Sequence, residues 1–78
     1  MRVNTVKGTR DYIDIYFSDG RIVRAYGEMV VGGFVAEKDS MTQWKEPEGE
    51  PVTEEQRQEI VDAVNEKNKD FKIDIMFE

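Results

Sequence analysis

The first clear pattern along the chain is an alternation between apolar and other side chains over residues 11–17. Ile13, Ile15 and Phe17 fall on one side of this alternation, which has the two-residue period of a half-buried β-strand. Ser18-Asp19-Gly20 follows directly and is typical of a tight turn. We therefore predict a β-hairpin that begins near Asp11.

The loop length of this hairpin decides which residues face each other. A two-residue loop would pair Ile15 with Arg24 and place a guanidinium on the apolar face, where its burial would cost free energy. A three-residue loop pairs Ile15 with Val23 instead, and it sets Asp14 against Arg24 on the second face. We therefore predict the three-residue loop. Its other expected pairs are Ile13 with Ala25, Tyr16 with Ile22, and Tyr12 with Tyr26.

Two short strands are expected around the glycines that follow the hairpin. Gly27 interrupts the apolar pattern, so the hairpin strand is predicted to end there. Residues 28–31 and 34–37 then have strand-like composition, with Gly32-Gly33 between them as a tight turn.

The segment after residue 37 loses the strand alternation. Ser40 is followed three residues later by Gln43, which predicts a capped helical turn with Met41 and Trp44 on one side. Prolines and a glycine within residues 45–51 predict an irregular loop after this turn.

A second capping-box match, Thr53 with Gln56, predicts the start of the main helix. Apolar residues at helical spacing continue this helix to about Asn68, and Glu54 and Glu55 lie in its first turn, where the helix dipole favours acids. Phe71, Ile73, Ile75 and Phe77 then alternate with other residues and predict a C-terminal strand that includes Lys72.

These elements predict one α+β domain over residues 1–78, because a chain of this length has little left for a second domain. We expect an antiparallel sheet of four to five strands with one main amphipathic helix packed on one face. The expected core comprises Ile13, Ile15, Phe17, Val23, Ala25, Ile60, Val61, Val64, Phe71, Ile73, Ile75 and Phe77, with Trp44 as a large contributor.

Composition narrows the chemistry that such a domain can perform. The chain contains no Cys and no His, which excludes disulfides, thiol nucleophiles, imidazole bases and the metal sites built from them. Pairs of carboxylates are uninformative in a chain with 17 acids, and a thin core tunes their pKa values poorly. We therefore assign no catalytic residue, metal or cofactor, and we expect a protein that is not an enzyme.

Charge and hydropathy indicate the environment and the partner. The net charge of −6 argues against direct nucleic-acid binding, which depends on clustered Lys and Arg. No apolar run is long enough for a membrane span or the core of a signal peptide, so we expect a cytoplasmic protein without membrane contact. An acidic protein of this size is better suited to a basic protein partner.

The excess negative charge is concentrated in one part of the chain. Residues 1–44 hold six basic and six acidic side chains, whereas residues 45–70 hold nine acidic and four basic, a net of −5. One interpretation is a solvated loop and helix face; the other is an acidic patch for a basic partner, with Trp44 either buried in the core or exposed as an apolar anchor. The candidate partner-binding residues are Trp44, Glu46, Glu48, Glu50, Glu54 and Glu55.

Several strings of the sequence resemble a known family. Gly27-Glu28-Met29, residues 38–44, residues 46–53 leading into a Glu-rich helix, and the ending Ile73-Asp74-Ile75-Met76-Phe77-Glu78 are similar to small immunity proteins of bacterial polymorphic toxin systems, immunity protein family seventy-four. This resemblance runs from about the first hairpin to residue 78.

The resemblance implies a protein that binds and neutralises a cognate toxin, with no catalysis of its own. A nuclease with a basic cleft is the kind of toxin that an acidic patch would fit, because the patch could occupy the cleft in place of phosphates. A stand-alone interaction or scaffold domain is the alternative, and a small carboxylate enzyme is a third class. The sequence leaves the oligomeric state open.

Overall fold

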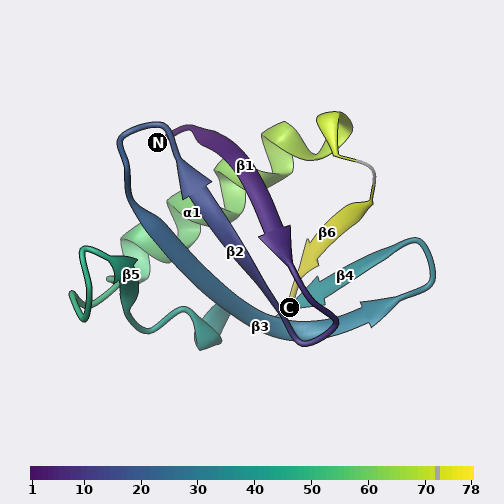
Figure 1. The fold of residues 1–78 in the computed structure, drawn as a ribbon, viewed down its shortest axis with the longest axis horizontal. Helices are drawn as coiled ribbons and strands as arrows, with labels where there is room; N and C mark the ends of the chain where they lie inside the picture. The colour runs from purple at the N-terminus through teal and green to yellow at the C-terminus, as the bar shows by residue number, and fades with distance from the viewer. Residues whose placement is uncertain (72) are drawn as a thin grey trace.

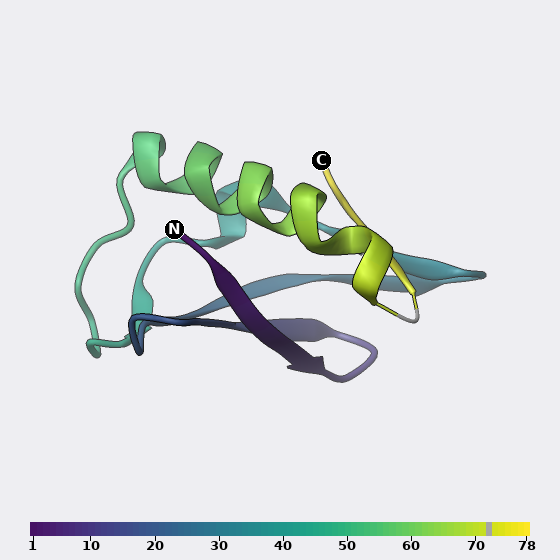
Figure 2. The ribbon, with the colours of Figure 1, turned by 90° about the horizontal axis from the view of Figure 1, so that it is seen from above.

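The computed structural model describes residues 1–71 and 73–78, and it consists of a curled sheet with one long helix laid across it (Figures 1 and 2). Along the sheet the strands follow the order β1-β2-β3-β4-β6, and β5 pairs with β3 beside this path. This arrangement confirms the predicted α+β class with one main helix. The elements are β1 (Val3–Gly8), β2 (Tyr12–Phe17), β3 (Ile22–Val30), β4 (Gly33–Ala36), β5 (Trp44–Glu46), α1 (Glu54–Lys67) and β6 (Asp74–Phe77), with short 3-10 turns at Lys38–Ser40 and Asn68–Asp70.

The hairpin formed by β2 and β3 has the predicted register. Ile15 lies opposite Val23 and Asp14 lies opposite Arg24, so the apolar residues share one face and the charged pair the other. The Phe17 N–H donates to the Arg21 carbonyl at 2.9 Å and closes a three-residue loop. Gly20 has a φ of 95°, a backbone conformation that favours glycine at this loop position.

Strand β3 continues through Gly27, so the predicted interruption there is wrong. At Gly27 the pairing of β3 changes instead: β3 pairs with β2 up to Tyr26 and with β4 from Gly27 onward. The neighbouring strand lies so close that a Cβ at this position would overlap the Val35 carbonyl oxygen. The turn to β4 is Val31-Gly32, since Val30 already pairs with Gly33, one residue earlier than the sequence predicts.

The sheet is mixed and not antiparallel throughout as predicted, because β6 pairs with β4 in the parallel direction while the other pairs are antiparallel. The chain crosses over the sheet through α1 before it reaches β6, and a crossover of this kind is what parallel pairing requires. Strand β6 begins at Asp74, later than expected. Ile73 lies before it, and Lys72 falls outside the described residues.

Strands β1 and β5 are absent from the sequence prediction. The register of β1 on β2 shifts between Val3 and Thr5, and this irregularity removes the alternation by which a strand is recognised. Strand β5 has only three residues, which is too short for a pattern, and it places Lys45 and Glu46 in the sheet rather than in an irregular loop.

The predicted helical turn after Ser40 is also wrong, because a 3-10 turn at Lys38–Ser40 precedes that position. The Ser40 hydroxyl donates to the Glu37 carbonyl at 2.6 Å and accepts the Tyr26 N–H at 2.9 Å. It therefore ties this turn to β3 and does not cap a helix.

The predicted capping box of α1 is confirmed. The Gln56 N–H donates to the Thr53 hydroxyl at 3.1 Å, and the Thr53 N–H donates to the Gln56 side-chain oxygen at 2.9 Å. Two backbone donors at the start of the helix are thus satisfied, and Ile60 and Val64 of the next turns are buried against the sheet.

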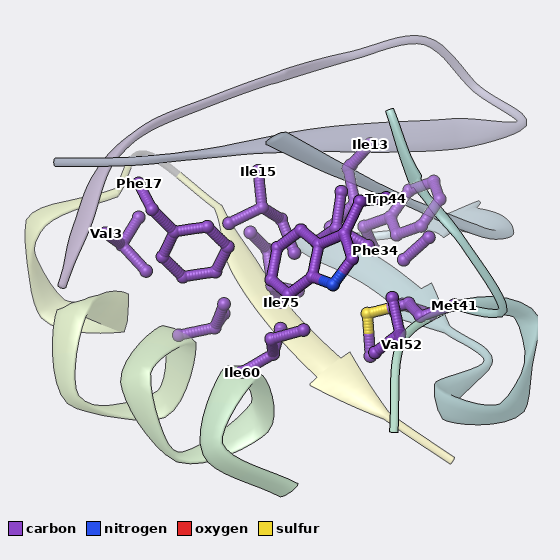
Figure 3. Packing of buried hydrophobic residues seen from close by; sticks show 14 residues of the cluster. Val3, Ile13, Ile15, Phe17, Phe34, Met41, Trp44, Val52, Ile60 and Ile75 are labelled. Carbon is purple, nitrogen blue, oxygen red and sulfur yellow. The ribbon is translucent and has the colours of Figure 1, made fainter. Parts of the chain in front are cut away.

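The core fills the space between the sheet and the helix (Figure 3). Most of the predicted core is confirmed, with Val61, Phe71 and Phe77 only partly buried at its margin. Ile73 is the exception, since it is 37% exposed at the approach to β6. The prediction missed Val3, Phe34, Ala36, Met41 and Val52, which lie mainly on the elements it did not recognise or placed differently.

Candidate functional site

The predicted loop over residues 45–51, which we call the acidic loop, is a folded hairpin that packs on the core. The Trp44 N–H donates to the Glu50 carbonyl at 2.8 Å, and the Gly49 N–H donates to the Trp44 carbonyl at 3.1 Å. Gln43 bridges to Pro51, and the Val52 N–H donates to the Thr42 carbonyl at 3.0 Å. The loop therefore has internal backbone support on both of its sides.

Arg57 connects this loop to the helix. One of its guanidinium nitrogens, Nη1, donates to the Val52 carbonyl at 3.0 Å and to the Met41 carbonyl at 3.4 Å. Since Arg57 belongs to the first turns of α1, the loop and the start of the helix are held together. Both lie at the same end of the molecule, at the left of Figures 1 and 2.

This end of the molecule carries the predicted glutamates, which are all exposed. None of them forms an ion pair with another residue in the described part of the chain. Lys45, the base nearest to them in the sequence, has its ammonium 3.6 Å from Asp14 instead. We call this surface the acidic end; it consists of Glu46, Glu48, Glu50, Glu54 and Glu55.

Trp44 belongs to the core and not to the surface of the acidic end. Its side chain is only 2% exposed, and its ring meets that of Phe17 edge-on with centroids 6.0 Å apart. The Arg21 guanidinium covers the ring 4.7 Å from its centroid (Figure 3 shows the indole between the sheet and the helix). The structure therefore supports the interpretation of Trp44 as a core residue. The assignment of Trp44 as an exposed, partner-binding anchor is corrected.

The sheet face turned away from α1 holds a compact cluster of charges and aromatic rings. Arg24 donates two hydrogen bonds to the Asp14 carboxylate, at 2.7 and 2.9 Å, and its guanidinium lies 3.7 Å from the centroid of Tyr12. The ring of Tyr12 meets that of Tyr26 at a centroid distance of 6.0 Å. This is the predicted cross-strand pair of opposite charges, flanked by the predicted aromatic pair.

The electrostatics of this cluster are those of a structural ion pair. The hydrogen bonds from Arg24 lower the pKa of Asp14 against the opposing effect of burial, and Asp14 in turn raises the pKa of Arg24. Asp19 also has a lowered pKa, chiefly because it accepts the Arg21 backbone N–H. Carboxylates held in the ionised form in this way are poor general acids.

The sequence prediction missed the place of Lys45 in this cluster. Lys45 reaches Asp14 from β5, a strand without a readable pattern, so no signal in the sequence could have indicated the contact. A hollow of about 570 Å³ opens beside the cluster, between β3 and the acidic loop. Its lining includes Arg24, Tyr26, Lys45 and Glu48, and it therefore carries charges of both signs.

The described residues contain no group of three or more Asp or Glu side chains placed to hold a metal ion. No helix among them is both long enough and apolar enough to cross a bilayer.

Comparison with protein families gives one match. The model of the family Immunity protein 74 matches residues 5–78, which is nearly the whole chain. Comparison with curated proteins and with solved structures finds no match. Because the family match covers the hairpin, the acidic loop, the helix and the last strand together, the chain belongs to the Immunity protein 74 family.

Proposed function

We propose that this protein binds and neutralises a cognate toxin in the cytoplasm of the bacterial cell that it protects, and that the acidic end makes the first contact. Its membership of the Immunity protein 74 family supports a toxin as the partner. The polymorphic toxin system from which the toxin comes, and the nuclease activity considered for it, are parts of this proposal.

Two features together support the acidic end as a binding surface: its carboxylates are unpaired in the part of the chain that the structure describes, and its backbone is held by hydrogen bonds. Five exposed glutamates lie within residues 46–55, without ion pairs among the described residues. Their backbone is held by the loop hydrogen bonds, the Arg57 contacts and the Thr53 capping box. Because their backbone is already ordered, only the side chains have to be immobilised when a partner binds, and this lowers the entropic cost of association.

Neutralisation by such a surface requires no chemistry. A nuclease toxin would present a basic cleft for the phosphates of its substrate, and the acidic end would fill that cleft and exclude the nucleic acid. Charges of this kind act mainly on the association rate and on the choice of partner. Exposed charges are screened over about 8–10 Å at physiological ionic strength, so the contribution of the acidic end should fall as salt is added.

The test is co-expression with the toxin domain encoded beside the gene. We expect growth to be rescued and a complex to co-purify. The end variant, E48Q/E50Q/E54Q, removes three charges of the acidic end and should bind the toxin more weakly, with a flatter dependence on salt.

A matched variant removes the same charge elsewhere on α1. The helix variant, E59Q/D62N/E66Q, changes three exposed acids outside the acidic end and should rescue growth like the wild type. Equal toxin binding by the end variant and the helix variant would exclude the acidic end as the toxin-binding surface. Absence of rescue and of a complex, with a folded protein, would leave a stand-alone interaction domain as the better description.

A further inference from the structure

A second concave surface lies on the sheet face turned away from α1, where β3 and β4 run side by side next to Asp11 of the β1–β2 loop. It has a volume of about 670 Å³ and lies near the β3–β4 hairpin, which points away from the acidic end in Figures 1 and 2. We call it the outer groove. It is lined by Asp11, Tyr26, Gly27, Glu28, Val30, Val35, Glu37 and Glu78.

The apolar part of the lining of the outer groove consists of Val30, Val35 and the ring of Tyr26. Val35 of β4 lies in register between Glu28 of β3 and Met76 of β6, so one row of side chains crosses all three strands. Val30 is 39% exposed although its side chain is apolar, and Met76, which pairs with Val35 but does not line the groove, is 45% exposed. Tyr26 is 51% exposed and stands where the outer groove meets the hollow beside the acidic loop, since it lines both.

The rim of the outer groove is entirely acidic. Asp11, Glu28, Glu37 and Glu78 are exposed, and no Lys or Arg lines the groove among the described residues. Lys38 is adjacent in the sequence to Glu37, but its ammonium bonds to the Gln58 side chain of α1 at 2.9 Å. Carboxylates of one sign around a concave apolar surface concentrate a negative potential in it.

We infer that the outer groove receives a segment of the toxin that carries lysine or arginine side chains. The aliphatic stem of such a side chain would cover Val30 and Val35, and its cationic end would reach the carboxylates of Glu28 and Glu37. This inference rests on the proposed function, because it takes the toxin as the partner. It adds an apolar contact surface to the interface, which the acidic end does not provide.

The large apolar side chains next to the acidic end, Trp44 and Val52, are buried, so they are not available for contacts with a partner. Protein interfaces gain most of their binding energy from apolar and aromatic side chains within a polar rim, and the outer groove has both. Tyr26 connects it to the hollow at the acidic loop, so one partner can contact both surfaces. The acidic end then sets the association rate, and the outer groove sets the dissociation rate.

The kinetics of binding to an inactivated form of the toxin domain separate the two surfaces. Because the bound segment would cover Glu28 and Glu37, their charge pairs would be buried in the complex. The groove variant, E28Q/E37Q/E78Q, should therefore raise the dissociation rate by about tenfold and change the association rate by less. The end variant, E48Q/E50Q/E54Q, removes the same charge and should mainly slow association. A dissociation rate of the groove variant within about twofold of the wild type would overturn the inference.

A second experiment tests the outer groove without the toxin. A blocked peptide of alternating arginine and valine is titrated into the labelled protein, and the amide shifts are followed by NMR. We expect shifts around Tyr26–Val30 and Val35 that weaken in the groove variant and persist in the end variant. Equal shifts in the groove variant, or shifts centred on residues 46–55, would refute the outer groove.

The toxin-binding kinetics and the peptide titration together distinguish a failure of the proposed function from a failure of the further inference. A wild-type protein that does not bind the toxin would contradict the proposed function, while the peptide titration would still decide whether the outer groove binds a basic segment. A protein that binds the toxin equally well with and without the groove carboxylates would contradict only the further inference.

Discussion

Replacement of Trp44 by alanine would test whether the acidic loop is built on the core. The indole is 2% exposed and packs against Phe17 and the stem of the loop. An aromatic side chain of this kind buries about 150–250 Å², which corresponds to about 4–6 kcal/mol at 25 cal/mol per Å² as an upper value. Measured substitutions of this type cost about 3–5 kcal/mol, so we expect a loss in that range.

This loss is large compared with the total stability of a small domain. A chain of 78 residues has a free energy of unfolding of about 4–12 kcal/mol at 0.05–0.15 kcal/mol per residue. Trp44→Ala should therefore remove a large share of the free energy of unfolding, and a wild-type stability at the lower end of this range would leave the variant partly unfolded at 25 °C. Urea unfolding followed by far-UV circular dichroism measures the effect without the tryptophan signal, which the substitution removes.

Trp44→Phe provides the comparison. The indole Nε1 is buried and has no hydrogen-bond partner among the described residues, and an unpaired donor of this kind costs about 1–3 kcal/mol. Phenylalanine keeps the contact with Phe17 and removes this donor, so its cost should be far below that of alanine. A change of less than about 1 kcal/mol for Trp44→Ala would refute the buried position, since it is below every value in the range for a core aromatic.

Four further predictions follow from other elements. Gly27→Ala should lower the free energy of unfolding by about 1–3 kcal/mol in urea titration, because its Cβ would overlap the Val35 carbonyl. Asn68→Ala should cost about 1–2 kcal/mol, and more than Asn65→Ala, since the Asn68 amide makes two hydrogen bonds to the backbone of Ile75 on the outer edge of β6. Size-exclusion chromatography should show more self-association of Asn68→Ala, because that edge is then open for pairing. Asp14, whose pKa is lowered by Arg24, should add stability that is fully present at neutral pH and is lost as the pH falls below about 4, so the stability difference between wild type and Asp14→Asn should shrink on acidification.

The features that the sequence predicted correctly are those whose signal is local. The register of the β2–β3 hairpin followed from one comparison, since only a three-residue loop keeps Arg24 away from the apolar face. The start of α1 followed from Thr53 and Gln56, because the capping box requires two residue types at a fixed spacing. Both signals lie within a few residues of the structure that they specify.

The features that it missed depend on distant partners. Strand β6 runs parallel to β4 only because α1 carries the chain across the sheet, and Lys45 meets Asp14 only because β5 joins β3. Ser40 matched a helix cap but bonds to Tyr26 of β3, so a tertiary contact overrode a local pattern. Glu78 also reaches the outer groove only because β6 pairs with β4, which no pattern within one segment specifies.

The acidic end was predicted as a charge excess, and the structure adds how its residues are held. Residues 45–70 carry a net charge of −5 that can be counted in the sequence, but the hydrogen bonds that shape the loop and the contacts of Arg57 cannot. The sequence also does not decide the position of Trp44, because the pattern of residues around it is the same for an exposed and for a buried side chain.

Toxin neutralisation through the acidic end can be tested by a calorimetric titration of the purified protein with an inactivated form of the toxin domain encoded beside its gene. The titration is run at low and at high salt. We expect a saturable complex of defined stoichiometry whose affinity falls as salt is raised, because charges of the acidic end contribute to binding. The absence of binding by a folded protein would contradict toxin neutralisation by direct contact, and tight binding that is indifferent to salt would contradict the role of the acidic end.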